Sequence, residues 1–170
     1  MATINPHRVT HAYDGEELAV FLIGMRINKP WRVRQWWPVF CAMPPMLKEL
    51  SLDPDSGLLG YRMILGAGGP TIIQYWDSTQ KLYAYASDPN AKHRPAWAKF
   101  NRLTRKVPAT VGIWHETFAI ARAESIYVGM PPTGLAKATS TVPVTARSDR
   151  AIDRLTGKTS RADKAQEPSA

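Results

Sequence analysis

The sequence predicts an α+β sandwich in which two helices cover one face of four antiparallel strands. Four apolar segments of strand length occur between residues 18 and 121, and two segments with helical periodicity separate the first from the second and the third from the fourth. The resulting order is strand, helix, strand, strand, helix, strand. With short connections and right-handed crossovers, this order predicts a ferredoxin-like βαββαβ arrangement.

The first three expected strands are the clearest. Residues 18–27 (LAVFLIGMRI) form a near-continuous apolar run, as in a strand that is covered on both faces. Residues 58–65 and 70–76 are rich in aliphatic, β-branched and aromatic residues. The glycine-rich residues 66–69 between them lack a following Gly-Lys-Ser/Thr and open no helix, so we interpret them as a hairpin loop and not a phosphate-binding loop.

The fourth expected strand, residues 111–121 (VGIWHETFAIA), carries a histidine. Side chains alternate along a strand, which places His115 on one face and Trp114 and Glu116 on the other. Residues 125–130 can form a further short strand, which Pro131-Pro132 would end.

The first helix is expected within residues 31–50, after a possible cap at Asn28. Its apolar positions follow the i, i+3, i+4, i+7 spacing of a buried stripe. Pro38 and the pair Pro44-Pro45 each remove a backbone donor, so this helix should be kinked or split.

The second helix follows the strand end at Trp76. Asp77 is the expected N-cap, with Gln80 at the capping-box position, and Asp88-Pro89 is expected to cap a second helical segment. In this second segment, residues at helical spacing form one inward face. They are His93, Ala96, Trp97, Phe100 and Leu103.

The length of 170 residues predicts one domain, residues 18–136, between an N-terminal arm (residues 1–17) and a disordered tail (residues 137–170). No apolar run is long enough to span a membrane, and the N-terminus lacks the pattern of a secretion signal. Cys41 is the only cysteine, so no intrachain disulfide is possible. We therefore expect a cytoplasmic protein.

The net charge of +8 divides into +3 in the tail and about +5 spread over the remaining chain. A nucleic-acid-binding protein more often shows a concentrated basic stripe, so no nucleic-acid or membrane partner is expected. Because residues 18–27 are apolar on both faces, the sheet face without helices should be buried against a second copy. The sequence thus predicts a homodimer.

Two histidines are the candidate catalytic residues. His93 can act as a general base, serve as an axial haem ligand, or simply bond a backbone carbonyl. His115 is catalytic or structural. No histidine pair has the spacing of a metal site, and neither a Gly-x-Ser-x-Gly elbow nor a dinucleotide fingerprint is present. Metal, hydrolase and nicotinamide chemistry are therefore not expected.

Several other residues are candidates for binding. Arg94 and Arg102 can hold an anionic substrate group or haem propionates, or be solvated charges. Trp76, Trp97 and Trp114 can wall a cavity for an apolar substrate, or belong to the core. Tyr85 is a further candidate for substrate binding.

Four motifs carry a resemblance to a known family. They are YWDS at residues 75–78, HRPAWxxFNR at 93–102, GIWHETF at 112–118 and YVGMPPTGL at 127–135. The chain resembles the monooxygenase-like family of the dimeric α+β barrel superfamily over residues 18–136. The resemblance implies a dimeric barrel with a ligand cavity between each sheet and its helices.

Relatives within that superfamily include cofactor-free oxygenases of aromatic polyketides, haem-degrading monooxygenases and haem-dependent aldoxime dehydratases. The haem-degrading enzymes have a helical histidine at about the position of His93, a tryptophan about ten residues before it and an asparagine in the first strand. Here Tyr85 or Ala84 stands near the tryptophan position, and residues 18–25 contain no asparagine. This departure from the pattern argues against haem degradation, and the resemblance leaves two expectations for the cofactor, none or haem.

Three hypotheses for function result. The first is a small dimeric monooxygenase-like oxidoreductase acting on an aromatic or isoprenoid molecule, with His93 as base or haem ligand. The alternative is a haem enzyme of the aldoxime-dehydratase type, or a non-catalytic protein that binds haem or an apolar metabolite. The third is a dimerisation module whose cavity is filled by its own aromatic residues.

Overall fold

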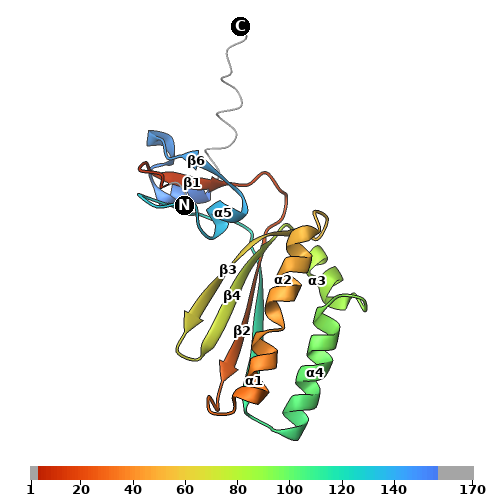
Figure 1. Ribbon diagram of the computed structural model, residues 1–170. Coiled ribbons are helices and arrows are strands. Elements are labelled where there is room, and N and C mark those ends of the chain that lie inside the picture. The colour runs from red at the N-terminus through yellow and green to blue at the C-terminus, as the bar shows by residue number, and fades with distance from the viewer. Residues whose placement is uncertain (1–3, 157–170) are drawn as a thin grey trace. The chain divides into compact units, whose positions relative to one another are not determined.

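The computed structural model describes residues 4–156 (Figure 1). The described chain divides into a central unit, residues 16–119, and a terminal unit formed by residues 4–15 and 120–156. Among the described residues, no helix has the length and apolar character that crossing a membrane requires.

The central unit contains one antiparallel sheet of four strands. They are β2 (Ala19–Ile27), β3 (Leu58–Gly66), β4 (Gly69–Trp76) and β5 (Val111–Ala119). Their order is β3-β4-β2-β5, so the first and third strands of the unit are neighbours at the centre. This order is the ferredoxin-like fold that the sequence predicts.

Four helices lie on one face of this sheet (Figure 1). They are α1 (Val33–Phe40), α2 (Met43–Leu52), α3 (Thr79–Ser87) and α4 (His93–Lys106). Each expected helix is split into two. Between α1 and α2 the split fits the prolines, because Pro44 and Pro45 stand in the first turn of α2, where no backbone donor is needed.

The predicted N-caps of the two helices between β4 and β5 are both wrong. The N-cap of α3 lies one residue after the predicted Asp77, and the N-cap of α4 lies four residues after the predicted Asp88. Ser78, and not Asp77, is the N-cap of α3, and its Oγ accepts a hydrogen bond from the Lys81 N–H at 3.2 Å. The Asp77 carboxylate instead pairs with the Lys81 ammonium at 2.7 Å. Asp88 is the C-cap of α3 and does not cap α4, which begins at His93.

The core of the central unit is small. It is centred on Trp76 and Ala19, which are both fully buried, and on Leu50 of α2 and Leu82 of α3. By contrast, neither α1 nor α4 contains a buried residue, although each has an apolar face. The two helices therefore cover the sheet without closing on it.

The terminal unit contains a two-stranded sheet. Strand β1 (Val9–Ala12) pairs with β6 (Ser140–Pro143), and Val9 forms a further bridge with Tyr127. Short helices follow at α5 (Leu135–Ala138), η1 (Ala146–Ser148) and α6 (Ala151–Leu155). The predicted irregular arm thus contains a strand, and residues 125–130 contribute isolated bridges instead of a strand.

The prediction of a disordered tail is wrong for residues 137–156. Its polar composition is offset by a buried ion pair, since the Arg154 side chain is only 7% exposed and pairs with Glu124. The same guanidinium donates hydrogen bonds to the backbone carbonyls of Ser148 and Asp149, each at 2.7 Å. The rest of the predicted tail, residues 157–170, lies outside the described residues.

Candidate functional site

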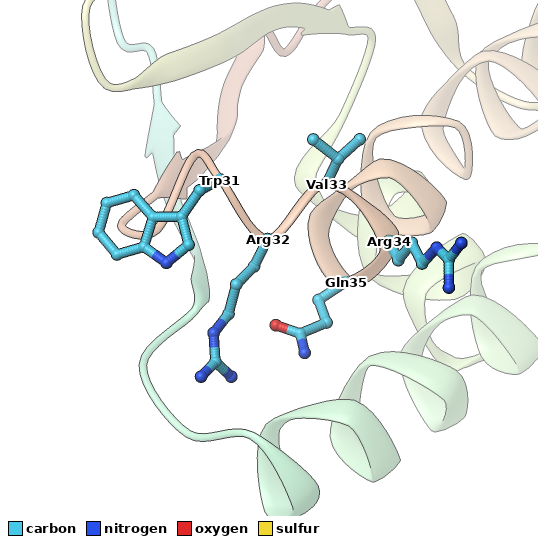
Figure 2. Close-up of a pocket in the computed structure, with 5 residues that line it drawn as sticks. All are labelled: Trp31, Arg32, Val33, Arg34 and Gln35. Carbon is cyan, nitrogen blue, oxygen red and sulfur yellow. The ribbon is translucent and has the colours of Figure 1, made fainter.

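A cavity of about 910 Å³ lies between the sheet and the helices of the central unit. Its floor consists of the inward side chains of β2, β4 and β5, and α1 and α4 contribute most of its roof. A second hollow of about 390 Å³ lies at the start of α1 and is lined by residues 31–35 (Figure 2). The larger cavity has the size and the mostly apolar walls of a small-molecule site.

The roof of the larger cavity is apolar and unfilled. On α4 the Trp97 and Phe100 rings stack with their centroids 5.4 Å apart, yet Trp97 remains 48% exposed. An apolar face that packed on the sheet would be buried, and this one is not. The geometry favours a space for a ligand over a cavity filled by the protein's own aromatic residues.

His93 has one engaged and one unengaged ring nitrogen. Its Nε2 lies 2.9 Å from the Ala86 carbonyl oxygen in the last turn of α3. A carbonyl oxygen only accepts, so Nε2 carries a proton, and in the neutral imidazole Nδ1 then has the lone pair. Among the described residues Nδ1 has no hydrogen-bond partner, and it is buried. His93 as a residue lines the cavity, whose walls are mostly apolar.

Aromatic rings connect His93 to the core. The centroid of the Tyr85 ring lies 5.1 Å from that of His93 and 6.3 Å from that of Trp76. The Tyr85 hydroxyl donates to Glu49 Oε2 at 3.2 Å, and the same oxygen accepts the Lys92 N–H at 3.2 Å. Burial, with the Glu49 charge as a second cause, raises the pKa of Tyr85 far above its ordinary value, so this phenol stays protonated.

Most of the sequence-predicted site residues line this one cavity. His93 and Arg94 come from α4, His115 from β5, and Trp76, Tyr85 and Trp97 from β4, α3 and α4. The His115 ring packs against Phe21, with 5.6 Å between ring centroids. The structure thus brings both histidines to one site, while their roles in catalysis remain predictions.

Trp114 does not line the cavity, so its predicted place in the wall is wrong. The alternation along β5 directs Trp114 to the opposite sheet face, where its indole covers Gly24. A Cβ atom at position 24 would lie 2.5 Å from the indole, so only glycine leaves room for this ring.

The sequence interpretation missed two amides in the cavity. Gln74 is 5% exposed, lines the cavity and accepts a hydrogen bond from Trp76 Nε1 at 3.0 Å. Gln35 also lines it, and its buried Oε1 has no partner among the described residues. The available signal for Gln74 was its position between Ile72 and Trp76 on the inward face of an apolar strand.

The geometry of His93 does not fit an axial haem ligand. Ligation through Nε2 would have to break its hydrogen bond to the Ala86 carbonyl, which holds this nitrogen at 2.9 Å. Nor do three or more metal-ligating side chains gather anywhere within residues 4–156. We therefore derive no chemical step through haem.

The chain is similar to several solved structures. Over 79% of its length the chain is similar to 42% of the aldoxime dehydratase OxdRE, with a TM-score of 0.59 and 17% identity. SnoaB, a cofactor-independent oxygenase from Streptomyces nogalater, gives a TM-score of 0.43 and 11% identity over 63% of this chain and 96% of its own.

A putative antibiotic biosynthesis monooxygenase from Chloroflexus aurantiacus gives a TM-score of 0.40 and 20% identity over 61% of this chain and 93% of its own. No curated protein matches the chain. At these identities the solved structures bear on the fold alone. The family model described as monooxygenase af470-like matches residues 18–135, which include all of the cavity, and the chain belongs to this family.

Proposed function

We propose that this protein is an oxygenase that removes a proton from an apolar small molecule through Nδ1 of His93. The observation that carries the proposal is the contact of His93 Nε2 with Ala86 O at 2.9 Å, which leaves Nδ1 without a hydrogen-bond partner among the described residues. Imidazole is the most common general base in enzymes. Family membership supports oxygenase chemistry, and the apolar cavity supports an aromatic or isoprenoid substrate.

The reaction that suits this site is the oxygenation of an acidic CH₂ group that enolises. Loss of one proton to His93 leaves an electron-rich enolate, which reduces O₂ and forms a hydroperoxide at the same carbon. The hydroperoxide then loses water to leave a carbonyl, so that R₂CH₂ and O₂ give R₂C=O and H₂O. The substrate supplies all the electrons, and no cofactor enters the balance.

Oxygen uptake with anthrone as the probe tests this proposal. We expect the protein to consume one O₂ per anthrone and to raise the rate of oxygen uptake above the uncatalysed rate. In His93→Gln the catalysed rate should fall by about 10²-fold or more, the usual contribution of a general base. Gln is the matched variant because its amide nitrogen can still donate to Ala86 O while no base remains. Full activity in a folded His93→Gln protein would refute the role of His93.

His115→Ala is the companion variant, because His115 lines the same cavity. If His115 only packs on Phe21, its removal changes the Michaelis constant for anthrone and leaves the turnover rate within a few-fold. A turnover rate as low as that of His93→Gln would instead place His115 in the chemistry.

A haem enzyme of the aldoxime-dehydratase type is the alternative that the likeness to OxdRE motivates. Titration with haemin, followed by absorbance, separates the two proposals. The oxygenase proposal expects no Soret shift that depends on His93. A saturable shift of one haem per subunit, lost in His93→Ala, would favour the haem enzyme.

We also propose that the protein is a homodimer formed through the sheet face without helices. Large apolar side chains on that face are exposed, among them Ile64 (43%), Trp114 (38%) and Phe118 (47%). Phe118→Glu should therefore give a monomer in sedimentation velocity, whereas the control Trp31→Glu, at the 74% exposed Trp31 outside the sheet, should not. A dimer that survives Phe118→Glu would contradict this interface.

A further inference from the structure

The cavity has a strongly unbalanced charge. Its walls include no aspartate or glutamate, but they include five cationic side chains. None of the five forms an ion pair with a carboxylate among the described residues. They are Arg34, Arg94, Lys99, Arg102 and Lys106.

These cations are concentrated at one end. Arg34 extends from the first turn of α1 (Figure 2), and α1 lies beside the C-terminal half of α4 (Figure 1). This half carries Arg102 and Lys106, and Lys99 stands at the middle of the helix. Arg94 alone lies near His93. The cavity therefore has a cationic end, an apolar middle lined by Trp97 and Phe100, and the imidazole of His93 at the other end.

We infer that the substrate is an apolar molecule that carries a carboxylate, which binds at the cationic end between Arg34 and Arg102. A guanidinium pairs with a carboxylate through two parallel hydrogen bonds, and this pairing favours an acid over a neutral molecule of the same shape. This inference rests on the proposed function and adds the chemical class of its substrate.

The fold also sets the length of that substrate. His93 and Arg102 are nine residues apart in α4, and a rise of about 1.5 Å per residue separates their Cα atoms by roughly 13 Å along the helix axis. The reacting carbon should therefore lie about this distance from the carboxylate. An extended chain of about ten carbons spans such a distance.

Isothermal titration with dodecanoate and 1-dodecanol tests the inference, because the two probes share a chain and differ in charge. We expect dodecanoate to bind about tenfold more tightly, equivalent to about 1.4 kcal/mol. Raising the salt concentration should weaken the binding of dodecanoate and leave the affinity for dodecanol unchanged.

Matched variants locate the carboxylate. Arg34→Gln/Arg102→Gln should reduce the preference for the acid to within about twofold. Arg26→Gln/Arg105→Gln makes the same change in net charge at residues that do not line the cavity, and it should keep the preference. Neither pair alters His93.

Equal binding of the two probes, binding of neither, or a preference that survives Arg34→Gln/Arg102→Gln would overturn the inference. Each of these results leaves the oxygen-uptake test with anthrone unaffected, since anthrone carries no carboxylate. Failure of the substrate class is thus distinguishable from failure of the proposed function.

Discussion

Ala96 of α4 lines the cavity, so Ala96→Phe tests whether the space under the helix is real. A full-sized aromatic side chain buries at least about 150 Å². If about 100 Å² of it is buried here, the apolar gain is about 2.5 kcal/mol. Rotamer entropy and helix propensity each cost about 0.5 kcal/mol. The free energy of unfolding should therefore rise by about 1–2 kcal/mol.

A closed core gives the opposite sign, because enlarging a packed residue costs about 1–3 kcal/mol. Urea unfolding measures the difference, with Ala98→Phe as the control. Ala98 is an exposed residue of the same helix and does not line the cavity, so its replacement should change the free energy by no more than about 0.5 kcal/mol. A fall of about 1 kcal/mol or more in the free energy of unfolding of Ala96→Phe would refute the cavity.

Two predictions concern the terminal unit. Arg154→Met leaves the Glu124 carboxylate without its cation and should cost about 2–3 kcal/mol of unfolding free energy in urea, whereas Arg8→Met, which breaks an exposed pair, should cost less than about 1 kcal/mol. Equal losses would contradict the buried pair. Burial lowers the pKa of His11, while Glu124 opposes this shift, so the unfolded chain binds more protons below about pH 6.5. Stability should fall from pH 7 to pH 5, and His11→Gln should reduce that dependence; an unchanged pH dependence would contradict it.

Periodicity was sufficient to predict the central unit. The apolar runs of β2 to β5 and the prolines that split the first crossover are local features, and the structure follows them. The caps were less predictable, because Asp77 and Ser78 are adjacent residues that can both cap a helix, and only the backbone of the preceding strand decides between them.

Pairing between distant segments was not predictable. The hydroxyl of Ser140 donates to the Ala12 carbonyl at 2.9 Å across 128 residues, and neither short polar segment shows the apolar alternation of a strand. At the candidate site, helical spacing predicted that His93 faces inward. The direction of its two ring nitrogens depends on Ala86 in another helix, which no sequence pattern indicates.

The central claim is that His93 holds its proton on Nε2 and offers Nδ1 to the substrate. Nitrogen NMR of histidine-labelled protein at neutral pH reports the tautomer of each imidazole directly. We expect His93 to show a protonated Nε2 and an unprotonated Nδ1, and the Nδ1 signal to move when an apolar acid such as dodecanoate is added. A proton on Nδ1 in the free protein, with Nε2 unprotonated, would contradict the account.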